Sequence, residues 1–161
     1  MTVLTDSEIW EILEGVKDPE IPVVSVVEMG IVREVTHEGD HIRVVMTPTF
    51  SGCPAIEMMR AEIEAQLRQA GAQQVEVVLS RSPAWSSEWI TPEARSKLRA
   101  FGLGPPPNHK GNLVLALQEV VSCPYCGSQE VTLKNSFGPT LCRMIYYCNH
   151  CNQPFEQFKP V

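Results

Sequence analysis

The 161-residue sequence has no long apolar run and no excess of basic side chains. A membrane-spanning helix needs about 20 predominantly apolar residues, so neither a membrane span nor a membrane partner is expected. Thirteen Lys and Arg against 19 Asp and Glu give a formal net charge of −6. Because phosphate contacts need a basic surface, this charge argues against nucleic acid as a partner.

The first residues also lack the positive start and apolar core of a secretory signal peptide. We therefore expect a cytoplasmic location, where cysteines face a reducing environment. Under such conditions the six cysteines suit metal ligands or reactive thiols better than disulfides. A hydrophobic share of 43% is typical of a chain that buries a core.

Helix and strand patterns alternate along the first hundred residues. Thr5 and Glu8 fit a capping box, and Thr91 followed by Pro92 fits the start of another helix, whose Phe101 is expected to face inward. The expected elements are a helix from Thr5 to Asp18, strands over 31–37 and 41–47, a helix from Pro54 to Gly71, a strand over 74–79 and a helix from Pro92.

This order predicts an α+β fold, with a small helix-flanked β-sheet domain (α-β-β-α-β-α) over residues 1–104. Three consecutive prolines favour extended geometry, so residues 105–112 are expected to form a semi-rigid linker. Residues 113–161 would then form a second, β-rich module, entered by a buried strand over 113–121.

Two Cys-x-x-Cys pairs, Cys123/Cys126 and Cys148/Cys151, are separated by 21 residues. Each pair can present two sulfurs to one ion from a tight turn, and two pairs complete a tetrahedron. The second module is therefore predicted to be a zinc ribbon with a structural zinc. Iron in a rubredoxin-like site is the alternative, because four thiolates do not distinguish the two metals. The module is too small to fold by burial, so the metal supplies folding energy.

Two further side chains lie near these pairs in the sequence. Cys142 is either a buried small hydrophobe or an additional thiolate ligand. His150, inside the second pair, is expected to be a solvent-facing turn residue.

Cys53, the single cysteine of the first domain, is the stronger candidate for a residue with a chemical role. Pro54 suits a first helical turn, which places Cys53 at or beside a helix N-terminus, where the helix dipole favours a thiolate. Gly52 permits an unusual backbone and a close approach by a partner. A nucleophile, a soft-metal ligand and an inert buried cysteine are all compatible with this spacing.

Several short motifs stand out along the chain. They are Asp18–Pro22, Glu28–Val32, Thr47–Pro54 and Trp85–Trp89 in the first domain, and Phe137–Cys142 and Pro154–Lys159 in the tail. The four segments of the first domain resemble the iron–sulfur assembly domain family, which includes bacterial SufT and the eukaryotic cytosolic iron–sulfur targeting factor. With the cysteine-rich tail, the whole chain resembles the D subunits of phenylacetyl-CoA epoxidase (phenylacetate-CoA oxygenase) systems. One departure is Ile90-Thr91, where the family often has Met-Ser, and Thr91 keeps the capping hydroxyl.

The resemblance implies a non-catalytic factor that inserts or repairs iron–sulfur centres in client proteins of phenylacetate degradation. The family's motif cysteine corresponds to Cys53, which would bind a transient cluster, with Asp18 and Thr47 nearby in the motif set. The implied clients are the oxygenase reductase, which carries a [2Fe–2S] cluster, or the di-iron subunit. One cysteine per chain cannot cage a cluster, so a homodimer or a ligand from a partner is implied. The alternatives are a thiol-dependent enzyme using Cys53 and a zinc-ribbon regulatory or interaction protein.

Overall fold

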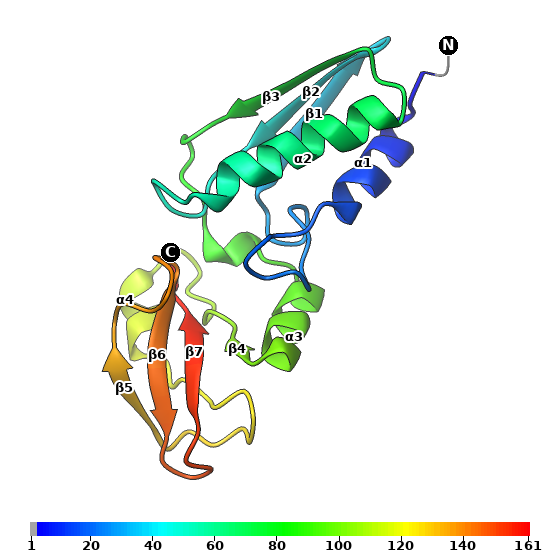
Figure 1. The fold of residues 1–161 in the computed structure, drawn as a ribbon. Helices are drawn as coiled ribbons and strands as arrows, with labels where there is room; N and C mark the ends of the chain where they lie inside the picture. Colours follow the sequence, from blue (N-terminus) through cyan, green and yellow to red (C-terminus); the bar gives the residue numbers. More distant parts are fainter. Residues whose placement is uncertain (1–2) are drawn as a thin grey trace. The chain divides into compact units, whose positions relative to one another are not determined.

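The computed structural model describes residues 3–161, which divide into two compact units. The first unit ends at Trp85, and the second runs from Ser86 to Val161. Each unit combines helices with its own sheet, so the α+β prediction is confirmed (Figure 1).

The first unit holds a three-stranded sheet in the order β1-β2-β3. Strands β1 and β2 form an antiparallel hairpin, whereas β2 and β3 are parallel and are connected through α2. The elements are α1 (Asp6–Gly15), β1 (Val32–Glu38), β2 (His41–Met46), α2 (Ala55–Gln69) and β3 (Gln74–Leu79).

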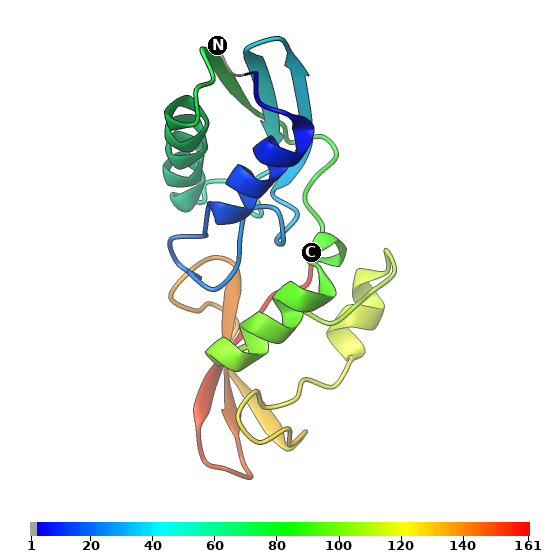
Figure 2. The same ribbon diagram turned by 90° about the vertical axis from the view of Figure 1, so that its right-hand side faces the viewer.

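The expected local patterns produce these elements. The Thr5 side chain accepts from the Glu8 N–H, and the Glu8 carboxylate accepts from the Thr5 N–H, which completes the capping box. Strand β2 buries alternate side chains, Ile42, Val44 and Met46, as expected of a sheet with one covered face. Helices α1 and α2 cover that face (Figures 1 and 2).

The second unit is built around a four-stranded sheet in the order β4-β7-β6-β5. Strands β5, β6 and β7 pair antiparallel, and the short β4 pairs in parallel with β7. The elements are the 3₁₀ turn η1 (Ser87–Trp89), α3 (Pro92–Phe101), β4 (Leu103–Gly104), α4 (Leu113–Gln118), β5 (Val131–Asn135), β6 (Arg143–Cys148) and β7 (Pro154–Phe158).

The division of the structure differs from the predicted boundary after residue 104. Helix α3 and β4 group with the ribbon because β4 bonds to β7, and a Cβ on Gly104 would lie 1.9 Å from the Gln157 side chain. Residues 105–112, predicted to be a semi-rigid linker, contact the second unit. Pro106 and His109 are buried, and the Gln157 amide donates to the Pro105 carbonyl at 2.7 Å.

Two local predictions in this unit are wrong. Residues 113–118 form helix α4 instead of a buried strand, because Asn112 caps the N–H groups of Val114 and Leu115. A short apolar run does not distinguish strand from helix by periodicity. Phe101 was expected to face inward, but it is the last residue of α3 and its side chain is 46% exposed.

Across residues 3–161, no helix is both long enough and apolar enough to cross a membrane.

Candidate metal centre and the Cys53 loop

The two Cys-x-x-Cys pairs form turns of the same design. In each turn the carbonyl of the first cysteine accepts an N–H four residues on, from Gly127 to Cys123 at 2.9 Å and from Asn152 to Cys148 at 3.0 Å. Gly127 and Asn152 both adopt left-handed backbone, with φ of 75° and 59°. Asn152 is not among the predicted site residues, although asparagine is one of the few side chains that tolerate this conformation.

These turns bring four thiols together. The sulfurs of Cys123, Cys126, Cys148 and Cys151 all lie within 4.8 Å of one another. Two opposing pairs are separated by 3.7 Å (Cys123 to Cys151) and 3.6 Å (Cys126 to Cys148). A tetrahedron with Zn–S bonds of about 2.3 Å has edges of roughly 3.8 Å. The four thiols therefore fit one zinc ion and leave no open coordination position.

The protein environment favours the charged form of one thiol in this cluster and disfavours the charged form of another. The N–H of Cys151, against the effect of burial and with help from the N–H of His150, lowers the pKa of Cys148 to about 6. Burial and the neighbouring sulfurs raise the pKa of Cys151 to about 12. Four thiolates at this separation repel one another, and a divalent cation at their centre relieves that repulsion.

One small apolar cluster of the ribbon includes thiols of the candidate metal site. Cys123, Cys148 and Phe155 are buried together, and Tyr146 stacks on Phe155 with ring centroids 5.7 Å apart. Two of the three buried members, Cys123 and Cys148, belong to the four-thiol cluster, so the candidate metal site and this apolar cluster overlap. This is the arrangement expected where metal binding supplies the folding energy.

Cys142 is not brought into this cluster. It precedes β6, while Cys148 ends the same strand, so six residues at about 3.3 Å each separate them by roughly 20 Å. Cys142 is 9% exposed, and its sulfur contacts the Thr140 hydroxyl at 3.1 Å. His150 is exposed in the turn, as expected.

Cys53 lies in the loop that leads into α2, one residue before the N-cap residue Pro54. Its side chain is half-buried, and Gly52 before it has φ of 81°, a conformation that glycine adopts without strain. The N-cap makes no side-chain bond to the first turn of α2. The positive end of the α2 dipole therefore lies next to the Cys53 thiol.

The Asp18 side chain stabilises the loop that follows α1. Its carboxylate oxygen Oδ1 accepts from the N–H groups of Glu20 at 2.8 Å and Ile21 at 3.2 Å. The side chain is only 8% exposed. This geometry is an Asx turn, which gives Asp18 a structural task whether or not it also acts near a cluster.

The Asx turn yields a prediction that separates these two tasks. Asp18→Ala leaves buried N–H groups with weaker partners and is expected to lower the free energy of unfolding by about 1–3 kcal/mol. Asp18→Asn keeps an acceptor oxygen and is expected to restore most of that loss. Urea unfolding of both variants measures the difference. Equal destabilisation by Ala and Asn would contradict the structural task and favour a role for the charge.

Thr47, which follows β2, is 2% exposed, and its N–H donates to the Ile31 carbonyl at 2.8 Å. Trp85 is 3% exposed, and its indole N–H donates to the Met29 carbonyl at 2.9 Å. Trp85 is thus a residue of the buried core. Its hydrogen bond joins two segments, 28–32 and 85–89, that carry the family resemblance.

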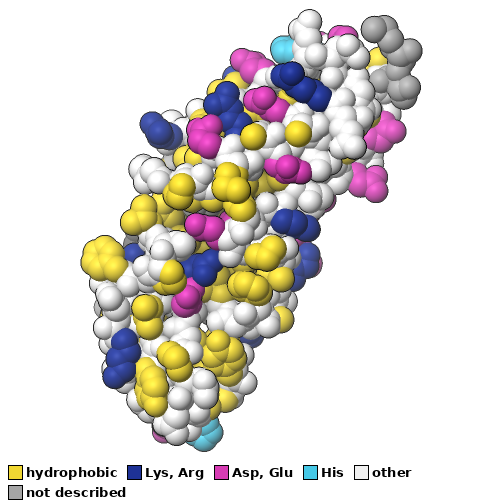
Figure 3. Space-filling model, in the orientation of Figure 1, with side chains coloured by type: hydrophobic (Ala, Val, Ile, Leu, Met, Phe, Trp, Pro, Cys, Tyr) yellow, Lys and Arg dark blue, Asp and Glu magenta, His cyan; other side chains and the backbone are white. Residues whose placement is uncertain are grey.

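Charged side chains of both signs are interspersed on the face shown in Figure 3. Lys and Arg alternate with Asp and Glu on the face shown in Figure 3, without a continuous basic stripe. The ribbon also presents large apolar side chains, including Tyr125 at 58% and Phe137 at 70% exposure. This surface is better suited to protein contact than to phosphate binding.

Comparison with known proteins supports both halves of this description. Residues 6–79 match the family described as iron–sulfur cluster assembly protein, and residues 108–159 match the PaaD zinc beta ribbon domain. A factor of Porphyromonas gingivalis named as an Fe-S protein maturation auxiliary factor is 30% identical, over 58% of this chain and 90% of its own.

Solved structures resemble the chain in fold. A domain of unknown function, DUF59, from Bacillus anthracis is 29% identical with a TM-score of 0.54, and covers 58% of this chain and 90% of its own. A conserved hypothetical protein from Thermotoga maritima is 30% identical with a TM-score of 0.52, and covers 61% of this chain and 98% of its own.

Fold and thiol cluster together define an iron–sulfur assembly domain followed by a zinc β ribbon. An Escherichia coli (strain K12) protein, provisionally named as the D subunit of 1,2-phenylacetyl-CoA epoxidase, is 42% identical over 154 residues. The match covers 96% of this chain and 92% of that protein. The chain therefore belongs to the same family as this epoxidase protein.

Proposed function

We propose that this chain is a non-catalytic accessory factor of a multicomponent phenylacetyl-CoA oxygenase in phenylacetate degradation. It assists the assembly or repair of an iron–sulfur or di-iron centre in a client protein of that system. The observation that carries the proposal is the position of Cys53, a partly exposed thiol at the start of α2 in a domain of the iron–sulfur assembly family.

The surroundings of Cys53 suit a ligand that binds and releases iron. The α2 N-terminus stabilises a thiolate, which is the form that coordinates metal. Gly52 in left-handed backbone has open space around its Cα, so a second ligand donor can approach the loop. The thiol therefore combines charge stabilisation with access.

The stoichiometry of ligands determines how the cargo is held. A [2Fe–2S] cluster takes four thiolates, whereas the assembly domain offers Cys53 alone. The remaining ligands come from a second copy of the chain or from the client. A cluster held by so few protein ligands is labile. This favours its transfer to the oxygenase reductase, whose cysteines replace Cys53 as ligands of the cluster.

In this proposal the zinc ribbon, residues 113–161, is a closed docking element. The proposed assembly domain comprises residues 1–104, so it continues past Trp85. Residues 105–112 are the proposed linker between this domain and the ribbon. In support, the match to the P. gingivalis factor spans 58% of this chain, which is longer than the first unit of 85 residues. Exposed Tyr125 and Phe137 offer the ribbon's contact surface to a client.

Anaerobic reconstitution with iron and sulfide tests the role of Cys53. The wild-type chain is expected to hold a labile cluster, measured by visible absorption and acid-labile sulfide. Cys53→Ala is expected to lower the cluster content by about tenfold or more, since loss of even an outer-shell partner costs 10–100-fold in metal affinity. Cys142→Ala is the matched control and is expected to behave as wild type.

Transfer to the apo-reductase provides the second readout, because a cluster bound only adventitiously is not passed on. Zinc content is measured alongside and is expected to be the same in all three chains. Equal cluster content in wild type and Cys53→Ala would rule out Cys53 as the ligand.

A further inference from the structure

A small polar cavity of the second unit lies between α3, the proline segment and the start of the ribbon. Its volume is about 230 Å³, and its lining includes Arg95 and Arg99 of α3, residues 105–108 and residues 119–122. Pockets for drug-sized ligands usually enclose about 300–1,000 Å³. The cavity is therefore sized for one side chain or a small ion rather than for a cofactor.

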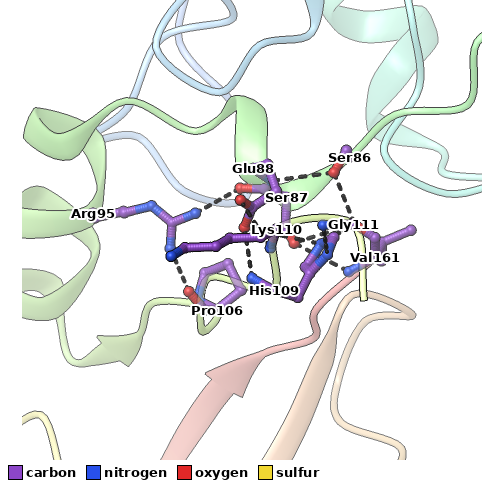
Figure 4. Close-up of polar contacts among 9 residues, drawn as sticks. All are labelled: Ser86, Ser87, Glu88, Arg95, Pro106, His109, Lys110, Gly111 and Val161. Atoms are coloured by element: carbon purple, nitrogen blue, oxygen red, sulfur yellow. Dashed lines mark hydrogen bonds and ion pairs between the residues drawn. The ribbon is translucent and has the colours of Figure 1, made fainter. Parts of the chain in front are cut away.

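Arg95 forms part of this lining and is held in place by carbonyl groups (Figure 4). Its guanidinium donates to the Ser87 carbonyl at 2.7 Å and to the Pro106 carbonyl. The segment around Ser87 is held in turn by Val161, whose N–H donates to the Ser87 hydroxyl at 3.1 Å and whose main-chain oxygen accepts from the Ser86 hydroxyl at 3.1 Å. Arginine carries five N–H donors, so these two bonds leave three donors of Arg95 for a ligand.

The positive charge of Arg95 is only partly compensated within the chain. Burial lowers the pKa of its guanidinium, and the charge of the Glu88 carboxylate opposes that effect. The Glu88 oxygens also accept from the N–H groups of His109 at 2.9 Å and Lys110 at 3.3 Å. Because Glu88 is shared among several donors, a further anion beside Arg95 would be stabilising.

Arg99 brings a second positive charge to the same cavity. It lies four residues after Arg95 on α3, a spacing at which like charges repel. Its Nη1 group contacts the Ser122 hydroxyl at 3.4 Å, and among the residues that the structure describes no carboxylate forms an ion pair with it. Glu119 is the one acidic side chain in the lining and is exposed, so the lining carries two positive charges and one negative charge.

A carboxylate matches this cavity in charge and in hydrogen bonding. Guanidinium groups bind carboxylate oxygens through parallel N–H donors, and a hydroxyl supplies a further donor. We propose that Arg95, Arg99 and Ser122 receive an aspartate or glutamate side chain of a protein partner. That the partner is the client rests on the proposed function, whereas the preference for a carboxylate does not.

An NMR titration of the full chain in the presence of zinc tests the carboxylate preference. The probe is the capped peptide acetyl-Gly-Glu-Gly-amide, and acetyl-Gly-Gln-Gly-amide is the matched neutral peptide. The glutamate peptide is expected to shift the Arg99 Nε–H and Ser122 N–H signals saturably, and the glutamine peptide is expected to leave them unchanged. No saturable shift, or equal shifts by both peptides, overturns the proposal. Tighter binding of inorganic phosphate than of the glutamate peptide overturns the assignment to a protein carboxylate.

Two substitutions change the charge of the cavity in opposite directions. Arg99→Gln is expected to weaken binding of the glutamate peptide about tenfold, because hydrogen bonds to charged groups are roughly twice as strong as neutral ones. Glu119→Gln is expected to strengthen it about twofold or more, since exposed charges interact weakly. Lys97→Gln removes the same charge from α3 outside the lining and is the control. Unchanged binding in Arg99→Gln, equal weakening in Lys97→Gln, or weaker binding in Glu119→Gln contradicts the proposal.

Cluster transfer shows whether the cavity acts in the proposed function. Arg99→Gln is expected to hold as much cluster as the wild type, because Cys53 lies in the first unit, and to pass it to the apo-reductase about tenfold more slowly. Transfer at the wild-type rate contradicts a docking role for the cavity. A wild-type chain that holds no cluster contradicts the proposed function instead, and the peptide titration then still decides on the carboxylate site.

Discussion

Cys148→Ser is expected to release the zinc and to unfold the ribbon strands β5, β6 and β7. Cys148 is 0% exposed and belongs both to the four-thiol cluster and to the small apolar core, so one substitution removes a ligand and disturbs the packing. Structural zinc contributes about 10–16 kcal/mol in zinc-finger peptides, more than a small module gains from burial. Zinc per chain and the chemical-shift dispersion of ribbon amides measure the effect.

The control for this experiment is Cys142, which lies at the other end of β6. Cys142→Ala removes a cysteine of similar burial that lies outside the cluster, and it is expected to keep one zinc per chain. Chelation of zinc from the wild-type chain is expected to reproduce the Cys148→Ser state. Full zinc content in Cys148→Ser, or zinc loss in Cys142→Ala, would show that the ligand set is wrong.

Trp85→Ala is expected to lower the free energy of unfolding of the first unit by about 3–5 kcal/mol. The indole is 3% exposed, so its removal leaves a cavity, and the Met29 carbonyl loses its donor. Urea unfolding with zinc present measures the loss. The loop that contains Met29 has no regular secondary structure, which makes this side-chain bond important for its position.

Two further variants separate the contributions of hydrogen bonding and burial to the stability lost in Trp85→Ala. Trp85→Phe retains much of the ring volume but not the N–H, and is expected to cost about 1–3 kcal/mol. Trp10→Ala removes an indole that is 36% exposed on α1, and is expected to cost much less. If Trp10→Ala destabilises as strongly as Trp85→Ala, the burial argument fails.

Local sequence predicted the elements of the first unit well. Capping at Thr5, the turn around Gly39 and the stop at Gly71 are each determined by a few neighbouring residues, and all three lie where expected. Prediction failed where a contact with a distant strand decides the outcome. The segment after α3 contains three prolines, yet β4 and Pro105 bond to β7 some 50 residues away.

By itself the sequence determined which four thiols gather in one cluster, because two-residue spacing within a turn is a local property. It also determined that Cys53 lies beside a helix N-terminus, since Pro54 and the apolar periodicity of α2 are local as well. Only the tertiary structure decided that Cys142 lies at the far end of β6, away from the other thiols. It alone brought Ser86 and His109 to Val161, across 75 and 52 residues of sequence. Such contacts depend on how strands pair and turns pack, and no short pattern of residues encodes them.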